Sequence, residues 1–233
     1  MKIAIMQPYF CSYIGYYQLI RSVDKFVICD NMQYTKKGWF NRNRILNNGN
    51  PKTFTIPLKK GSDYLNANQR YLAKNTLKDK NSILTQIQSF YKKAPFFEQN
   101  YPVIRELFLK DIDNLFDFIH YSVITLCNYL NIKTEIIVCS SLDIDHELKS
   151  HLRVLEICKF LNADVYINSI GGKELYSKSN FKKEGIELKF INSKKIEYEQ
   201  FKYKFVPWLS IIDVLMFNST EKIYEMLNKY DLI

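Results

Sequence analysis

Glycine is scarce in this sequence, with 7 glycines among 233 residues. Few segments can therefore cradle a phosphate through glycine backbone alone, and the one glycine pair, Gly171-Gly172, lacks the lysine spacing of a Walker motif. Long apolar runs are also missing, because none approaches the roughly 20 residues that a membrane-spanning helix needs. The first residues enter a predicted strand directly, without the pattern of a signal peptide. We therefore expect a cytoplasmic protein that does not insert into membranes.

Cysteine and histidine do not occur in the patterns that metal or nucleophilic chemistry requires. The 5 cysteines form no CxxC pair and are odd in number, which indicates free thiols in a reducing compartment. The 3 histidines, His120, His146 and His151, show no paired spacing such as HExxH. Neither a Ser-His-Asp nor a Cys-His arrangement is supported. The sequence therefore predicts no metal site and no protease-like nucleophile.

The charge balance favours lysine and arginine and gives a formal net charge of +9. Such a surface suits either nucleic acid or an anionic small substrate. No arginine-rich cluster and no nucleic-acid motif supports the first alternative. The hydrophobic fraction of 47% is enough for a sizeable core and argues against disorder.

Short apolar runs alternate with helical patterns at both ends of the chain. Strands are predicted at residues 3–6, 26–29, 53–58, 135–139, 163–168 and 186–191. Helices are predicted at residues 13–23, 76–92, 97–109, 113–129, 152–161, 174–184, 208–217 and 221–228. A strand, a crossover helix and a second strand at the amino terminus force a parallel sheet. The sequence therefore predicts a single α/β domain, residues 1–233, with a Rossmann-like open parallel sheet of about five strands and a helical insert at about 76–130.

Polar residues follow the first two predicted strands. Gln7 and Tyr9 come after the first strand, and Asp30 and Gln33 come after the second. Ligands of open parallel sheets bind beyond the carboxyl ends of the strands, so these residues are candidate catalytic groups. A carboxylate at Asp30 could accept a proton from an attacking amine or bind a sugar hydroxyl; the alternative is a cap on the following loop.

A basic segment follows at residues 36–44. Arg42 and Arg44 alternate with asparagines, and alternate residues of an extended chain point to one face. Two guanidiniums on one face suit a diphosphate, with Lys36 and Asn43 as further candidate contacts. The alternative is a solvated basic ribbon. The run is too polar for a core strand, so we expect a loop or an edge ribbon over the carboxyl edge of the sheet.

Candidate ligand contacts also occur late in the chain. Gly171 and Gly172 end a predicted strand where an anion could meet free N–H groups, and Tyr176 follows within a turn. Ser210 and Asp213 are three apart on a predicted helix and hence share a face. They are either buried and paired, or they line the ligand site.

Long stretches of this sequence resemble one family. The matching segments are MQPYFCSYIGYYQLI, VDKFVICDNMQYTKKGWFNRNRIL, TIPL, YINSIGGKELYSKSNFKKEGIEL and FVPWLSIIDVL. In this order they are similar to the WbqC-like protein family and cover nearly the whole chain. The resemblance implies a sugar-modifying role in bacterial O-antigen and other surface-polysaccharide pathways.

A looser likeness links the amino-terminal unit to the pantothenate synthetase type of nucleotidyltransferase-like fold. In that branch a histidine-rich turn after the first strand grips ATP phosphates. The equivalent turn here holds Tyr9, Tyr13, Gly15 and Tyr16, and Gln33-Tyr34 takes the place of a Q-F pair at the acyl substrate. The histidines are missing, which puts adenylation by that route in doubt and leaves the positive charge to the arginines.

These resemblances imply an enzyme that forms an amide on the amino group of a nucleotide-linked deoxyamino sugar. The donor would be a small acyl or aminoacyl unit, for example glycyl, and nucleic acid would take part only if transfer RNA carried that donor. Gln7 and Tyr9 would donate hydrogen bonds to the developing oxyanion. No cofactor is identified, and ATP is the one candidate. The alternatives are a nucleotidyltransferase or adenylating enzyme of the same fold, and a non-catalytic binding protein of the assembly pathway.

Overall fold

Six strands form the central sheet of the computed structural model, which describes residues 1–233. Their order from edge to edge is β5-β2-β1-β6-β7-β8. The strands are β1 (Lys2–Met6), β2 (Lys25–Ile28), β5 (Glu135–Val138), β6 (Val165–Ser169), β7 (Glu187–Ser193) and β8 (Tyr230–Leu232). The first five are parallel and β8 runs antiparallel to β7. The predicted Rossmann-like sheet of about five parallel strands is confirmed, and β8 was missed because three residues are too few to show an alternating pattern.

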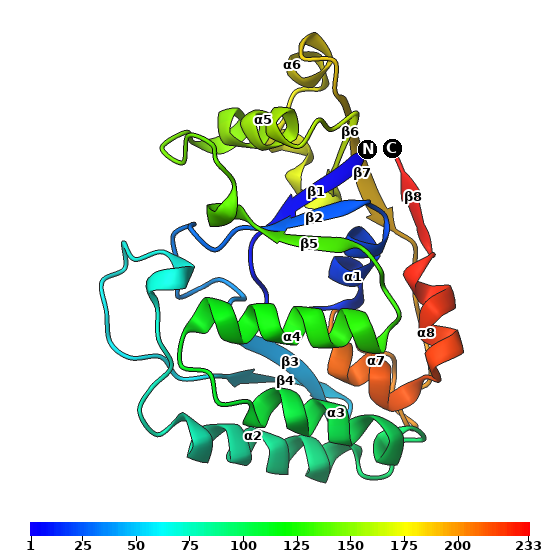
Figure 1. The fold of residues 1–233 in the computed structure, drawn as a ribbon. Helices are drawn as coiled ribbons and strands as arrows, with labels where there is room; N and C mark the ends of the chain where they lie inside the picture. Colours follow the sequence, from blue (N-terminus) through cyan, green and yellow to red (C-terminus); the bar gives the residue numbers. More distant parts are fainter.

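Helices cover both faces of this sheet (Figure 1). One face packs against α1 (Ile14–Arg21) and α8 (Thr220–Leu227), and the other packs against α5 (Ser150–Phe160) and α6 (Lys178–Lys183). Alternate residues of a strand enter different cores: Ala4 belongs to the larger cluster, whereas Ile3 and Ile5 belong to the smaller one. From β1 the chain adds β2 and β5 on one side of the sheet and then β6 and β7 on the other side. Open α/β sheets bind ligands at such a switch point, which here lies at the carboxyl end of β1.

The helical insert packs into the larger of the two cores. It consists of α2 (Thr76–Tyr91), α3 (Phe97–Leu109) and α4 (Leu115–Tyr129). The predicted bounds of α3 are confirmed at both ends. α4 begins two residues later than the predicted start at residue 113, and Asn114 caps it, because its side chain accepts hydrogen bonds from the N–H groups of Phe116 and Asp117.

A β-hairpin occupies the segment expected to be a loop or ribbon. β3 (Arg42–Asn47) pairs antiparallel with β4 (Asn50–Thr55), and the pair forms a separate two-stranded sheet. Asn48 and Gly49 connect the strands with φ values of 48° and 77°, the left-handed conformation that a two-residue hairpin turn requires. The strand predicted at 53–58 therefore begins and ends three residues earlier.

The last part of the chain departs from prediction at two helices. α7 (Ile211–Phe217) begins three residues after the predicted start, because Trp208 adopts a left-handed φ of 60° and Ser210 caps the helix. The helix predicted at 174–184 is a 3-10 segment, η3 (Ile170–Leu175), followed by α6. The shorter 3-10 segments are η1 (Ala67–Gln69) and η2 (Cys139–Ser141). None of the helices combines the length and apolarity needed to cross a lipid bilayer.

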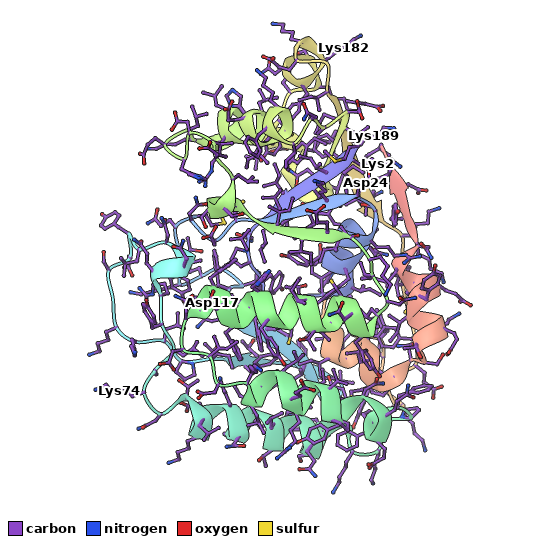
Figure 2. The ribbon with its side chains drawn as sticks, in the orientation of Figure 1. Lys2, Asp24, Lys74, Asp117, Lys182 and Lys189 are labelled. Carbon is purple, nitrogen blue, oxygen red and sulfur yellow. The ribbon has the colours of Figure 1, made fainter.

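The amino edge of the sheet is closed by polar contacts. Asp24 accepts a hydrogen bond from the N–H of Lys2 at 2.7 Å, and the terminal amine of Met1 pairs with Asp164. Figure 2 shows Lys2, Asp24 and Lys189 together at this edge.

Candidate functional site

The loop after β1, residues 7–13, is fixed by side chains from two other elements. Asn43 of β3 donates from Nδ2 to the carbonyls of Phe10 (3.1 Å) and Cys11 (2.6 Å). Ser210 donates from Oγ to the same Cys11 carbonyl at 2.6 Å, and Cys11 itself has a left-handed φ of 43°. Asn43 and Ser210 are fully buried, so the structure places these two predicted ligand contacts inside the scaffold.

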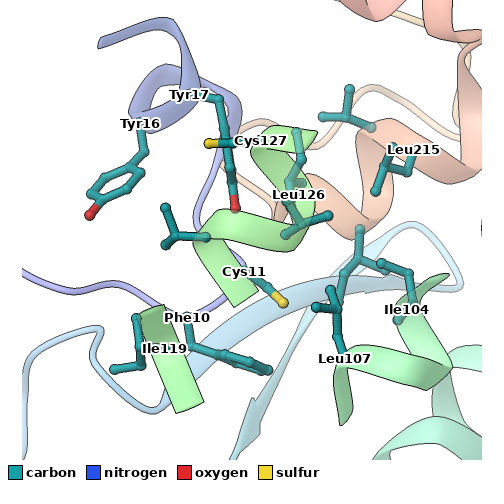
Figure 3. Packing of buried hydrophobic residues seen from close by; sticks show 14 of the residues in the cluster. Phe10, Cys11, Tyr16, Tyr17, Ile104, Leu107, Ile119, Leu126, Cys127 and Leu215 are labelled. Atoms are coloured by element: carbon teal, nitrogen blue, oxygen red, sulfur yellow. The ribbon is translucent and has the colours of Figure 1, made fainter. Parts of the chain in front are cut away.

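Apolar side chains of α3 and α4 pack against the same loop, residues 7–13. Figure 3 shows Phe10 and Cys11 beside Ile119 of α4 and Leu107 of α3. The Phe10 ring stacks on Phe118 with centroids 4.8 Å apart. The neighbouring side chains Tyr9 and Tyr13 are therefore presented to the carboxyl edge from a rigid support.

Four aromatic rings and two guanidiniums gather at this loop. This aromatic-arginine cluster consists of Tyr9, Tyr13, Trp39, Arg42, Arg44 and Trp208. The Tyr9 ring lies 6.1 Å from Trp39 at an interplanar angle of 27° and 6.4 Å from Tyr13. Tyr13 in turn meets Trp208 edge-on at 5.7 Å. The rings thus form one continuous surface across loop 7–13, the β2–β3 connection and the segment before α7.

The arginines of β3 both face the Trp39 ring. Their guanidinium carbons lie 4.9 Å (Arg42) and 5.4 Å (Arg44) from the ring centroid, which confirms that the two side chains share a face. Arg42 donates from Nε to the Gly38 carbonyl at 2.9 Å and also contacts the Lys37 carbonyl. Arg44 donates to the Trp208 carbonyl at 3.0 Å, while its buried Nε has no partner. Neither guanidinium has a carboxylate partner.

Two tyrosine hydroxyls of the cluster are available as hydrogen-bond donors. Burial raises the pKa of Tyr9, against the opposing effect of Arg44 and Arg42, and burial also raises the pKa of Tyr13. Both hydroxyls therefore stay protonated at neutral pH. Gln7 is tied to α1 through its carbonyl, which accepts from the Tyr16 hydroxyl at 3.0 Å. Tyr16, a predicted ligand contact, lies in the core with 2% of its surface exposed.

Asp30 is engaged within the protein. Its carboxylate accepts from Asn68 Nδ2 at 2.7 Å and from the N–H of Ser140 at 2.9 Å, and the residue is 3% exposed. With both oxygens occupied, this geometry favours the loop-capping alternative over a base that reaches substrate.

Gln33 and Lys36 lie on the exposed outer loop. Gln33 donates from Nε2 to the Asp63 carbonyl at 2.7 Å, and Lys36 forms an exposed ion pair with the Asp63 carboxylate at 2.9 Å. Neither side chain contacts the aromatic-arginine cluster.

The glycine turn lies away from the cluster. Gly171 is exposed, and Gly172 is buried where a Cβ would come within 2.6 Å of Asn168 Nδ2. Tyr176 packs edge-on against Tyr166 and Phe181, on the face covered by α5 and α6. No hydrogen bond or aromatic contact joins these residues to Arg42 or Arg44. The candidate residues predicted at the carboxyl edge of the sheet therefore do not form one group: Tyr9 and the arginines meet at Trp39, whereas no hydrogen bond or ion pair joins Asp30 or the glycine turn to them.

Asp213 is the centre of a buried hydrogen-bond network. Its carboxylate accepts from the hydroxyls of Tyr91 and Tyr198 and from Gln200 Nε2, each at 2.7 Å. The residue is fully buried, and burial raises its pKa to about 6 although the three hydrogen bonds oppose this. Of the two alternatives for Ser210 and Asp213, the structure shows buried and paired side chains.

The raised pKa of Asp213 predicts a pH-dependent stability. Well below pH 3.8 the Asp213 carboxyl holds its proton in both the folded and the unfolded protein. Between its ordinary pKa of 3.8 and the raised pKa of about 6, only the folded protein holds that proton. The stabilising contribution therefore falls by about 3 kcal/mol as the pH rises through this window. Urea unfolding at several pH values should show this loss in the wild type. Asp213→Asn, which does not titrate, should lack it; equal slopes for the two proteins would contradict the prediction.

Two residues of the cluster, Trp39 and Trp208, were not among the candidate site residues predicted from the sequence, and Tyr13 was named only as part of the turn after the first strand. Trp39 lies between polar residues that were predicted instead, and Trp208 was predicted to lie inside a helix. One signal was available: Trp39 and Trp208 are the only 2 tryptophans of the chain. An exposed tryptophan with a left-handed φ, as at Trp208, is uncommon and occurs at functional sites more often than elsewhere.

Comparison with known proteins gives a family but no solved relative. The model of the WbqC-like protein family matches residues 7–225. "Uncharacterized protein Rv1507c" of Mycobacterium tuberculosis (strain ATCC 25618 / H37Rv) is 25% identical over 230 residues, which cover 92% of either chain. No solved structure matches.

Proposed function

This chain belongs to the WbqC-like protein family, and from that premise we propose that it is an amide-forming enzyme of bacterial surface-polysaccharide biosynthesis. It transfers a small acyl or aminoacyl unit, such as glycyl, to the amino group of a nucleotide-linked deoxyamino sugar. The aromatic-arginine cluster is the substrate site in this proposal.

One observation carries the proposal. Arg42 and Arg44 present two guanidiniums beside Trp39 with no carboxylate to neutralise them, and the Arg44 Nε donor is buried without a partner. A guanidinium without a carboxylate partner keeps its charge and its remaining N–H donors available to an anion. A diphosphate offers several acceptors and the complementary charge, and planar guanidiniums bind phosphate with paired hydrogen bonds.

The reaction needs hydrogen-bond donors that stabilise the acyl oxygen, because the sugar amine itself is the nucleophile. The sugar amine attacks the acyl carbon; the new C–N bond forms, the bond to the leaving group breaks, and the amine proton departs with the leaving group or to solvent. The Tyr9 hydroxyl, which the raised pKa keeps protonated, supplies a hydrogen bond to the developing oxyanion. Asn43 and Asp30 act as positioning residues, because each fixes a loop at the carboxyl edge.

Activation of the donor is a separate question from transfer. None of the three histidines lies in loop 7–13, so that loop cannot grip ATP through imidazoles. The proposal covers donors that arrive activated, including one carried by transfer RNA, and donors activated with ATP.

A ligand and turnover panel tests the proposal. Thermal shift should detect binding of a thymidine-diphosphate-linked amino sugar, and mass spectrometry should detect the gain of one acyl unit on that sugar. The donors to supply are free amino acid with ATP, acyl thioester and aminoacyl transfer RNA. Stabilisation by ATP alone, with pyrophosphate release and no acylated sugar, would favour the adenylating alternative. Binding of the sugar nucleotide without turnover by any donor would favour a non-catalytic binding protein.

A further inference from the structure

A cavity of about 570 Å³ opens beside the aromatic-arginine cluster. It is lined by the start of α1, by the segment that leaves β7 and by the segment that enters α7. Tyr13 and Trp208 line this cavity and also belong to the cluster. The volume falls within the roughly 300–1,000 Å³ typical of small-molecule sites.

The lining of the cavity is aromatic and basic. Phe205 and Tyr198, both in the lining, meet edge-on with ring centroids 5.1 Å apart. Three lysines and one glutamate supply the charge of the lining. Lys194 pairs with Asp231 (2.8 Å) and Lys195 with Glu197 (2.9 Å), but Lys204 has no ion pair. The cavity thus combines flat apolar walls with one uncompensated cation.

The amino end of α1 adds unsatisfied donors to the lining. No side chain caps this helix and its first turn contains no acidic residue. The first N–H groups of a helix lack intrahelical partners and favour negative charge. Ile14 and Gly15, which carry such groups, lie in the lining.

We propose that this lysine-aromatic cavity binds the nucleoside half of a nucleotide-linked substrate, with the phosphates at the start of α1 between Lys204 and Arg44. The base packs among the aromatic rings, and the diphosphate reaches the arginines past Tyr13 and Trp208. Arg44 already marks this boundary, because it donates to the carbonyl of Trp208. The inference rests on the proposed function: it assigns the nucleoside of the proposed substrate to the cavity and the diphosphate to the arginines.

Gly15 is the residue that permits this arrangement. A Cβ at position 15 would come within 2.3 Å of the Tyr13 ring, so alanine would displace the ring that separates the cavity from the cluster. Gly15 has a helical conformation that alanine favours, but the displaced ring also packs against Trp208, so the two effects on stability oppose each other. Thermal denaturation of Gly15→Ala alongside its affinity measurement separates a loss of binding from a loss of folding.

Calorimetric titration with nucleoside diphosphates and with inorganic pyrophosphate tests the inference. With thymidine diphosphate as the first probe, and its uridine, cytidine, guanosine and adenosine counterparts as the panel, Lys204→Ala should weaken the tightest ligand about tenfold. Lys202→Ala, two residues away on the same segment but outside the cavity, should leave the affinity unchanged. Phe205→Ala should weaken the nucleoside diphosphate about tenfold and leave pyrophosphate unaffected. Gly15→Ala should weaken both ligands, because it displaces the Tyr13 ring at the start of α1, where the phosphates bind.

The outcomes separate this inference from the proposed function. Wild-type affinity in Lys204→Ala, Phe205→Ala and Gly15→Ala, with weakened binding in Arg44→Ala, would overturn the cavity assignment and leave the proposed reaction standing. The expected cavity pattern without any acylated sugar would support the nucleoside site and overturn the reaction. Absence of binding by every nucleoside diphosphate and by the sugar nucleotide would overturn both.

Discussion

Arg44→Ala is expected to weaken binding of a nucleoside diphosphate or its amino-sugar conjugate by about 30-fold, or about 2 kcal/mol. The wild-type guanidinium lacks a carboxylate partner, so the variant loses a charge and N–H donors that are available to the ligand, together with the hydrogen bond to the Trp208 carbonyl. Arg44→Lys should recover part of the affinity, because an ammonium keeps the charge but not the planar pair of donors. Titration calorimetry measures both effects.

Arg21→Ala is the matched control for this prediction. Arg21 also stacks over an aromatic ring, that of Tyr224 at 4.0 Å, and donates to Asn228, but it lies at the far end of α1. Its replacement should leave ligand affinity unchanged. Arg42→Ala should act in the same direction as Arg44→Ala and less strongly, because Arg42 already donates to two backbone carbonyls. Unchanged affinity in Arg44→Ala would show that the guanidinium pair is not a phosphate clamp.

Asp213→Ala should lower the free energy of unfolding by about 4 kcal/mol, since three buried donors lose their acceptor at about 1–3 kcal/mol each, partly offset by relaxation and water. The network joins α2, α7 and the loop that walls the cavity, and it extends to β3 because the Tyr91 hydroxyl accepts from the N–H of Leu46 at 2.7 Å. Chemical denaturation measures the change.

Glu225→Ala provides the comparison for Asp213→Ala. Glu225 forms an exposed ion pair with Lys222 on α8, and exposed pairs of this kind contribute little. Its variant should unfold at the same denaturant concentration as the wild type. If Asp213→Ala did the same, the buried network would not be a major source of stability.

Local patterns were sufficient for the five parallel strands of the central sheet and for most helices. The bounds of α3 were predicted at both ends, and the shared face of Arg42 and Arg44 followed from their spacing alone. Both inferences depend on periodicity within a few neighbouring residues, which the sequence contains explicitly.

Long-range contacts explain what the sequence did not predict. The residues that donate hydrogen bonds to the Asp30 carboxylate, Asn68 and Ser140, lie 38 and 110 positions further along the chain. No local sequence pattern therefore shows that Asp30 holds these two segments together. Asn43 made β3 look too polar for a strand, yet its side chain is fully buried on the backbone of loop 7–13. A polar residue that satisfies another segment's carbonyls has the same sequence signature as a solvated one.

The position of the two tryptophans gives the protein an internal optical reporter. Trp39 lies among the arginines and Trp208 borders the cavity, and the chain has no other indole. Its long-wavelength emission therefore originates wholly from these two places, without any attached dye. A molecule that settles at the carboxyl edge will change that emission, and one that adheres elsewhere will leave it as it was.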